Sequence, residues 1–297
     1  MTTILSPRLA IPLLMLLSSI FAANHIAARV AFDHGASVAA AVTVRSGATA
    51  LVMVMLLRLA GVGMALPRAT LARGLGIGLL VAIQSFCLYS AVAVIPVALA
   101  LLAFNTFPML FMLLTWAAGG ESPGRRAMVA MPMALFGLVL ALDILGTLEA
   151  MAGRWAQIGA GVGWALGAAT SFALVLYLTT HHLKEVDGRM RTLLTMGTTA
   201  LVVGGAGAAA GTLALPADAT GWLGLALLTA LYGSAITAMF TVVPRIGAAS
   251  NTAALNFEPI AALILGWAIL GQGMAPRQLV GALIVVGAVI LVGTKRH

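Results

Sequence analysis

The sequence predicts an all-α integral membrane protein with ten transmembrane helices, arranged as two inverted five-helix repeats. Three observations lead to this prediction. Hydrophobic residues fill 62% of the 297 positions and charged residues only 8%, whereas about a quarter of the residues of an ordinary soluble domain are charged. The apolar residues form runs long enough to cross a bilayer. One of these runs also has a second copy about half a chain later.

Apolar runs of about 20 residues have the length that a helix needs to cross the hydrocarbon core. We expect ten spans, at residues 11–31, 36–57, 71–94, 96–118, 127–145, 157–180, 193–215, 221–243, 248–270 and 278–291. The first run is longer than the core of a typical signal peptide and has no convincing cleavage site after it, so we interpret it as the first span. The 33 glycines suit helices that approach closely in lipid.

The short loops between these spans carry most of the positive charge. When both termini are placed in the cytoplasm, most of the 16 Lys and Arg residues fall on that side of the membrane, as the preference of positive loops for the cytoplasm requires. Arg29, Arg154 and Arg277 then fall on the outer side, and Arg45 lies within a span. The net charge of +8 is therefore interpreted as a signal of membrane topology. The basic residues are scattered between the apolar runs, which argues against the continuous basic stripe that a nucleic-acid-binding surface would need.

An internal repeat connects the fourth and ninth spans. The stretch LALLAFNTFPMLFMLLTW at residues 99–116 is echoed by SNTAALNFEPIAALILGW at residues 250–267. A shift of 151 positions aligns Asn105 with Asn256, Pro108 with Pro259 and Trp116 with Trp267. We therefore expect two repeats, residues 1–150 and 151–297. A duplicated unit with an odd number of spans enters the membrane the other way up, so the middles of these two spans would lie near a central pseudo-twofold axis.

Glu258 is the one acidic residue that we expect near the centre of a span. Ionisable side chains are costly in hydrocarbon and are therefore functional or paired. Four interpretations remain open for Glu258: a proton-coupling carboxylate, a ligand for a substrate amine, a partner of Arg45 or His25, and a structural acid that caps backbone groups beside Pro259.

His25 and Arg45 are the other ionisable candidates within spans. His25 would titrate near neutral pH and relay protons, or it would make an interhelical hydrogen bond with no further role. Arg45 would extend to the outer surface, pair with Glu258 or attract a substrate carboxylate.

Uncharged polar and aromatic side chains within the spans would supply the rest of a cavity that is mainly apolar, with a few convergent polar groups. The polar set is Gln84, Tyr89, Asn105, Tyr177, Tyr232, Ser234 and Asn256. The aromatic set includes Phe86, Phe104, Phe107, Trp164, Phe172 and Phe257.

An enzyme is not predicted. Ser234 and the distant His25 lack the spacing of a nucleophile and its base. The lone cysteine, Cys87, argues against an internal disulfide and against a cysteine-based metal site. We expect no cofactor, no metal and no nucleic-acid partner.

The paired motifs identify a family resemblance. The segments NTFPMLFMLLTWAAGGE at residues 105–121 and NFEPIAALILGWAILGQ at residues 256–272 resemble those of the drug/metabolite transporter superfamily, in its ten-helix branch built from two EamA-type repeats. The resemblance extends over residues 11–292. Phe107 stands where the first repeat of that family has an acid, and Gln272 stands where the second repeat ends on one. A mechanism that needs a symmetric pair of carboxylates is therefore not expected.

Within that superfamily the chain looks most like the YddG-type exporters of aromatic and other neutral amino acids. The resemblance implies a multi-pass protein of the bacterial inner membrane, with both termini cytoplasmic, that exports small metabolites by alternating access around a central cavity. The substrate-binding role carries over to Gln84, Tyr89, Asn105, Trp164, Tyr232, Asn256 and Glu258. The expected coupling or gating residues are His25, Arg45, Glu258, Pro108 and Pro259. The alternative is a proton-coupled exporter of drugs or cationic metabolites. The expected partners are a small-molecule substrate and membrane lipid, with a monomer as the working expectation.

Overall fold

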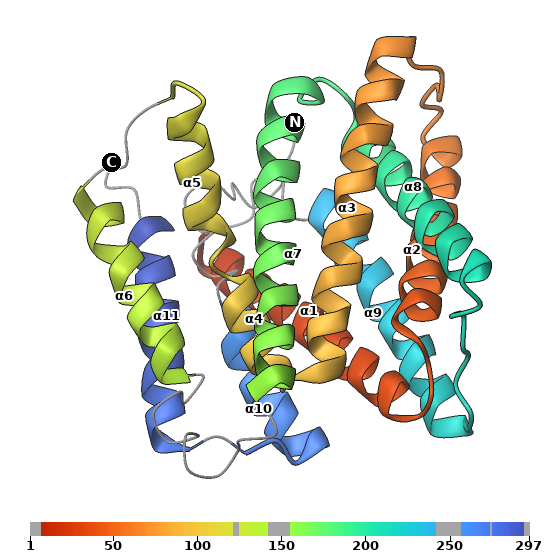
Figure 1. Ribbon diagram of the computed structural model, residues 1–297. Helices are drawn as coiled ribbons and strands as arrows, with labels where there is room; N and C mark the ends of the chain where they lie inside the picture. The colour runs from red at the N-terminus through yellow and green to blue at the C-terminus, as the bar shows by residue number, and fades with distance from the viewer. Residues whose placement is uncertain (1–6, 121–124, 142–154, 242–256, 274, 294–297) are drawn as a thin grey trace.

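The chain is described by a computed structural model that covers residues 7–120, 125–141, 155–241, 257–273 and 275–293. Within these ranges every regular element is a helix, as expected (Figure 1). The helices are α1 (Pro7–Asp33), α2 (Val38–Leu59), α3 (Arg68–Val94), α4 (Val97–Phe104), α5 (Phe107–Ala117), α6 (Arg125–Ala141), α7 (Trp155–His182), α8 (Gly188–Ala209), α9 (Ala219–Thr241), α10 (Glu258–Leu270) and α11 (Pro276–Gly293).

Most of these helices have the length and composition of membrane spans. In the described ranges, 7 stretches are long and apolar enough to cross a bilayer, and α4 together with α5 forms one of them. Shorter apolar helices occur within α6, α10 and α11. Large hydrophobic side chains such as Leu51, Leu201 and Leu283 are exposed on the outside of the bundle. This surface suits contact with lipid, because a soluble protein rarely leaves so much apolar area uncovered.

The interruption expected in the fourth span is present. Pro108 lies in the first turn of α5 and has no backbone N–H to continue the hydrogen-bond ladder of α4. At the break, Asn105 Nδ2 donates to the Leu101 carbonyl oxygen at 2.8 Å, and Thr106 Oγ1 donates to the Ala103 carbonyl oxygen at 2.8 Å. The same two oxygens also accept from the backbone N–H groups of Asn105, at 2.9 Å, and Thr106, at 3.2 Å. The side chains therefore add a second hydrogen bond to each oxygen at the point where the helix is interrupted inside the membrane. The proline and its two polar neighbours therefore produce a stable break.

The seventh span lies closer to the N-terminus than predicted. The prediction was residues 193–215, whereas α8 begins at Gly188 and ends at Ala209. The Asp187 carboxylate accepts a hydrogen bond from the Arg189 backbone N–H at 2.8 Å, which caps the start of the helix. At the other end, Gly211 has a φ of 63°, a left-handed conformation that ends a helix. Apolar content alone did not reveal these two local signals.

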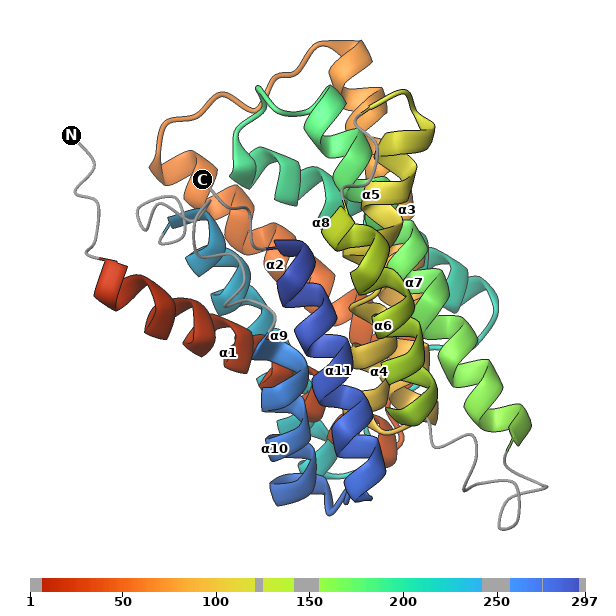
Figure 2. The same cartoon turned by 90° about the vertical axis from the view of Figure 1, so that its left-hand side faces the viewer.

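The helices pack as pairs that are distant in sequence. Helix α3 packs along α7 and α1 packs along α9, while α2 lies against α8 and α6 against α11. The α6–α11 pair lies side by side both in Figure 1 and in Figure 2. Helix α4 lies at the centre, where it contacts α3, α7 and α10, and all of its residues are buried. The break after α4 is therefore at the core of the bundle.

Candidate ligand cavity

A cavity of about 250 Å³ lies at the break between α4 and α5, with walls from α1, α2, α3, α7, α9 and the first residue of α10. Its polar lining consists of Ser18, His25, Arg45, Gln84, Tyr89, Asn105, Tyr232 and Glu258. Its apolar lining consists of Phe21, Leu88, Phe104, Phe107, Phe172 and Ile236. A mainly hydrophobic pocket with a few convergent polar groups is the usual composition of a small-molecule site.

Arg45 is the principal charged group of the polar wall. Its side chain projects from α2, and the residue is only 3% exposed. Nη1 donates to the Tyr89 hydroxyl at 3.1 Å and Nη2 donates to Ser85 Oγ at 3.0 Å. The guanidinium carbon also lies 4.8 Å from the centre of the Tyr89 ring and 3.8 Å from that of Tyr232. The two tyrosine rings thus hold the cation by cation–π contact and keep it away from the surface.

The Tyr89 hydroxyl connects this cation to α1. It accepts the hydrogen bond from Arg45 and donates one to Asn24 Oδ1 at 3.1 Å. The Tyr89 ring is fully buried and lies 5.4 Å from the ring of His25. Residues of α1, α2 and α3 therefore form one hydrogen-bonded cluster along this side of the cavity.

Glu258 is paired with His25. The distance between His25 Nε2 and Glu258 Oε1 is 3.5 Å, with the histidine side chain 6% exposed and the carboxylate side chain 20% exposed. Of the interpretations left open for Glu258, this contact agrees with the one in which the carboxylate pairs with His25. The contact also joins α1 to the start of α10, which lie in different halves of the chain. Of the two groups, the carboxylate is the more accessible to a ligand.

The apolar wall is a cluster of phenylalanines around the helix break. The ring centres of Phe104 and Phe107 are 5.3 Å apart, and that of Phe172 lies 5.5 Å from the first and 4.8 Å from the second. Rings at these separations attract one another and give a rigid apolar surface. The break brings Phe104 and Phe107 to the same wall, and Phe172 of α7 completes it.

The structure brings most of the predicted site residues to this cavity. Gln84, Tyr89, Asn105, Tyr232, Glu258, His25 and Arg45 all line it. Trp164 does not: its residue is 41% exposed, and its ring pairs with Phe86 at 6.2 Å on the outside of the bundle. Pro108 and Pro259 lie in the first turns of α5 and α10 and shape the backbone beside the cavity. Asn256 lies outside the described residues.

The expectations for Arg45 are corrected in part. The guanidinium does not reach the outer surface, because it is buried between the tyrosines. Among the described residues its partners are hydroxyls, and the carboxylate of Glu258 contacts His25 instead. The physical reason is that the hydroxyls of Tyr89 and Ser85 on α3 lie within hydrogen-bond distance of the Arg45 guanidinium on α2.

Several lining residues were missed. Ser18 and Phe21 precede His25 on α1 at the spacing of one helical face, and Ile236 follows Tyr232 by one turn on α9. The same spacing rule applied to the predicted residues would have found them.

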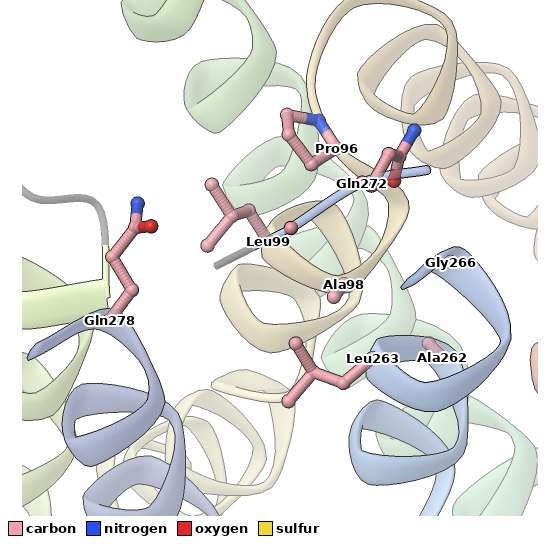
Figure 3. Close-up of a pocket in the computed structure, with 9 residues that line it drawn as sticks. Pro96, Ala98, Leu99, Ala262, Leu263, Gly266, Gln272 and Gln278 are labelled. Atoms are coloured by element: carbon pink, nitrogen blue, oxygen red, sulfur yellow. The ribbon is translucent and has the colours of Figure 1, made fainter. Parts of the chain in front are cut away.

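A smaller pocket lies at the other end of α4. It measures about 30 Å³ and is lined by residues around the start of α4 and along α10 and the turn after it, with Gln278 on its far side (Figure 3). Gln272 Oε1 accepts a hydrogen bond from the Val97 backbone N–H at 3.2 Å. This space holds about one water molecule. The amide therefore ties α10 to α4 rather than forming a ligand site.

Two larger hollows open on the outside of the bundle. One, of about 600 Å³, lies between α1, α9 and α10. The other, of about 550 Å³, lies between α2 and α9. Both are lined mainly by small and aliphatic side chains that lipid would cover in a membrane. Among the described residues, no group of three or more His, Cys, Asp or Glu side chains is placed to hold a metal ion.

Comparisons with known proteins agree with this architecture. Residues 159–294 match the EamA-like transporter family. One crystal structure has a similar fold, with a TM-score of 0.63, 16% sequence identity, and coverage of 94% of this chain and 97% of its own. At that identity the likeness concerns the fold alone. No curated protein matches the sequence.

Proposed function

We propose that this chain is a multi-pass transporter of small molecules, in keeping with the EamA-like match over residues 159–294. The apolar helices and the central cavity support this function. The family match also favours a transporter over an enzyme. We place the protein in a bacterial inner membrane, with both termini in the cytoplasm.

The proposed mechanism is alternating access between two inverted five-helix repeats. The helix contacts support it. If the two repeats correspond, α1 is equivalent to α7 and α3 is equivalent to α9, so a contact between α3 and α7 implies an equivalent contact between α9 and α1. Both pairs are in contact. The cavity supports it too. A shift of 151 positions relates Phe21 to Phe172 and Phe107 to Glu258, and all four residues line the cavity. Rocking of one repeat against the other would expose a site at their interface alternately to the two sides.

For the substrate we propose neutral amino acids, aromatic ones above all, moved outward. The single observation that carries this proposal is the division of one cavity into a phenylalanine wall and a polar wall. An aromatic ring suits the first wall and an amino-acid head group the second. The volume of about 250 Å³ lies just below the roughly 300–1,000 Å³ of sites for drug-sized ligands, which favours a compact metabolite.

Transport by the purified protein in proteoliposomes tests this proposal. A labelled panel of aromatic amino acids, aliphatic amino acids, quaternary amines and sugars should show flux of the aromatic amino acids above that of empty liposomes. Export is tested by the same panel in inverted membrane vesicles, which should accumulate substrate. Flux restricted to sugars or to quaternary amines would contradict the amino-acid proposal.

A proton-coupled exporter of drugs or cationic metabolites is the second candidate. The observation that favours it is the partly accessible Glu258 carboxylate in the cavity, in contact with His25. In that case Glu258→Gln would abolish flux, and export would require an inwardly directed proton gradient, with the outer side more acidic. An amino-acid carrier without proton coupling would keep its flux in this variant when the pH gradient is dissipated.

The orientation of the chain is tested by labelling of single cysteines. Cysteines replacing Arg126 and Lys295 should both react with an impermeant reagent from the cytoplasmic side, in a variant that lacks Cys87. Reaction of the two from opposite sides would contradict the inverted-repeat topology.

A further inference from the structure

Arg45 is a buried cation without an anionic partner in the described part of the chain. The residue is 3% exposed, and its hydrogen bonds go to the hydroxyls of Tyr89 and Ser85. The ion pairs of the described residues involve other cations: His25, Arg29, His34, Lys184 and Arg189. A buried charge is costly unless it is paired. The tyrosine rings offset only part of that cost, because a cation–π contact is weaker than an ion pair with good hydrogen-bond geometry.

Two donor groups in the cluster around Arg45 lack an acceptor. Arg45 Nε and Asn24 Nδ2 are buried side-chain nitrogens without a hydrogen-bond partner. His25 Nδ1 is also buried without a partner, and it donates or accepts according to the tautomer of the ring. Asn24 belongs to the same cluster through Tyr89, and His25 lines the same cavity as Arg45. Nearly all buried polar groups in folded proteins find partners, so such a cluster points to a missing acceptor. The acceptor that also balances the charge is an anion.

We propose that the ligand of the central cavity carries a carboxylate, and that Arg45 binds it. This proposal rests on the transport function proposed above and specifies what the polar wall recognises. The carboxylate lies toward Arg45, and the rest of the ligand lies against the wall of Phe104, Phe107 and Phe172. The amino group of an amino acid is then a secondary feature. Aromatic carboxylates that lack an amino group are therefore ligands as well.

A monocarboxylate fits this cavity better than other anions do. Guanidinium has five N–H donors in a planar fork that matches a carboxylate, and the hydroxyls of Tyr89 and Ser85 occupy two of its nitrogens. Glu258 lines the same cavity, so a ligand with two negative charges would be repelled. A ligand that carries only a positive charge would lie between Arg45 and His25 without gaining the anion that Arg45 lacks.

Four related compounds test the proposal on the wild-type protein. Isothermal titration calorimetry of the full chain in lipid nanodiscs measures the binding of phenylalanine, 3-phenylpropionate, phenylalaninamide and phenethylamine. Phenylalanine carries both an ammonium group and a carboxylate. 3-Phenylpropionate lacks the ammonium group, whereas phenylalaninamide and phenethylamine lack the carboxylate. We expect phenylalanine and 3-phenylpropionate to bind with dissociation constants within about tenfold of each other. Phenylalaninamide and phenethylamine should bind at least about tenfold more weakly than either carboxylate, the factor that corresponds to 1.4 kcal/mol.

Variants then assign the effect to Arg45. Arg45→Gln should bring the four dissociation constants to within about threefold of one another by weakening the carboxylates, and Arg45→Lys should restore part of the preference because it restores the charge. Arg58→Gln is the matched control, since it removes the same charge from the same helix at an exposed position in the last turn of α2. It should leave all four constants unchanged. The wild-type ligand series stands alone if Arg45→Gln does not fold.

The outcomes separate this proposal from the proposed function. Equal binding of phenylalanine and phenylalaninamide would overturn carboxylate recognition and leave amino-acid transport intact. Binding of 3-phenylpropionate without binding of phenylalanine would support carboxylate recognition and contradict the amino-acid proposal. Binding of phenethylamine alone, or of none of the four compounds, would overturn the role assigned to Arg45.

Discussion

The cluster around Arg45 can be tested by removing a single oxygen atom. Tyr89→Phe keeps the ring 4.8 Å from the guanidinium carbon but deletes the hydroxyl that accepts from Arg45 Nη1 and donates to Asn24 Oδ1. One donor of a buried cation and one amide oxygen then lose their partners. Tyr232→Phe is the matched control. Its ring lies 3.8 Å from the same carbon, but within the described residues its hydroxyl contacts just the Met196 sulfur, at 3.6 Å.

The expected cost follows from the two hydrogen bonds lost. A bond with a charged partner contributes about 1.5–3 kcal/mol and a neutral one about 0.5–1.5 kcal/mol in soluble proteins. Hydrogen bonds between membrane helices average about 0.6 kcal/mol. Tyr89→Phe should therefore lower the free energy of unfolding by about 1–4 kcal/mol. Tyr232→Phe should cost about 0.5 kcal/mol or less, because thioether sulfur is a weak acceptor.

Thermal unfolding of the purified variants in one detergent measures the difference. A loss of 1 kcal/mol lowers the unfolding temperature of a domain of roughly 150–250 residues by about 2–4 °C. On that scale Tyr89→Phe should unfold at least about 1 °C below Tyr232→Phe. Equal unfolding temperatures for the two variants would refute the reasoning, because the hydroxyl of Tyr89 would then have no structural role that the hydroxyl of Tyr232 lacks.

Three further predictions concern helix packing, a helix cap and the apolar wall. Gly281→Ala should lower the free energy of unfolding by about 1–3 kcal/mol, because its Cβ would lie 2.5 Å from the Gly137 carbonyl oxygen where α11 crosses α6. Gly287→Ala, with no atom within 4 Å, should cause no loss, and equal losses in thermal unfolding would contradict the close crossing. The hydrogen bond from the Arg189 side chain holds the pKa of the Asp187 carboxyl below its usual value. The ionised carboxylate therefore contributes its full stability above the unfolded pKa of about 3.9, and this contribution is lost as the pH falls through the lower pKa of the folded state. Asp187→Ala should therefore cost about 0.5–2 kcal/mol at neutral pH and progressively less in acid, and a gap in unfolding temperature that does not depend on pH would argue against the ion pair. Phe172→Leu should weaken the binding of phenylalanine by about two- to tenfold, the equivalent of about 0.5–1.5 kcal/mol for an aromatic pair. Trp164→Leu should leave this binding unchanged, and the reverse result in calorimetry would move the apolar wall to the other side of α7.

Much of the fold could be predicted because it depends on local composition. Apolar length marked the helices, and the proline with its neighbouring amide marked the break between α4 and α5. The ends of α8 were less accessible to this approach, since they depend on a cap at Asp187 and a left-handed glycine at Gly211. The same is true of Gln272, which was noted as a departure from a family pattern. Its role as a hydrogen-bond partner of Val97 required the structure.

The candidate site was predictable in its composition and less so in its pairings. Rare polar side chains within apolar spans were sufficient to single out residues such as Arg45, Tyr89 and Glu258, because such groups are retained in a membrane only where they are paired or used. Trp164, by contrast, was selected as an aromatic residue and through the family resemblance, and it faces outward. An aromatic residue is compatible with lipid and with a ligand, so its type alone does not decide between them.

The sequence by itself determined that the chain is helical and apolar enough for a membrane, where its central helix breaks, and which polar residues the bundle has to accommodate. Only the tertiary structure decided how each helix is rotated about its axis, and therefore that Arg45 meets Tyr89 and Ser85 while Glu258 meets His25. The physical reason lies in the solvent. A helix in water shows its buried face by contrast with a polar one, but in lipid both the buried and the outer faces are apolar. The pattern of hydrophobic residues therefore predicts the length of each helix, but packing against the neighbouring helices decides its rotation about its own axis.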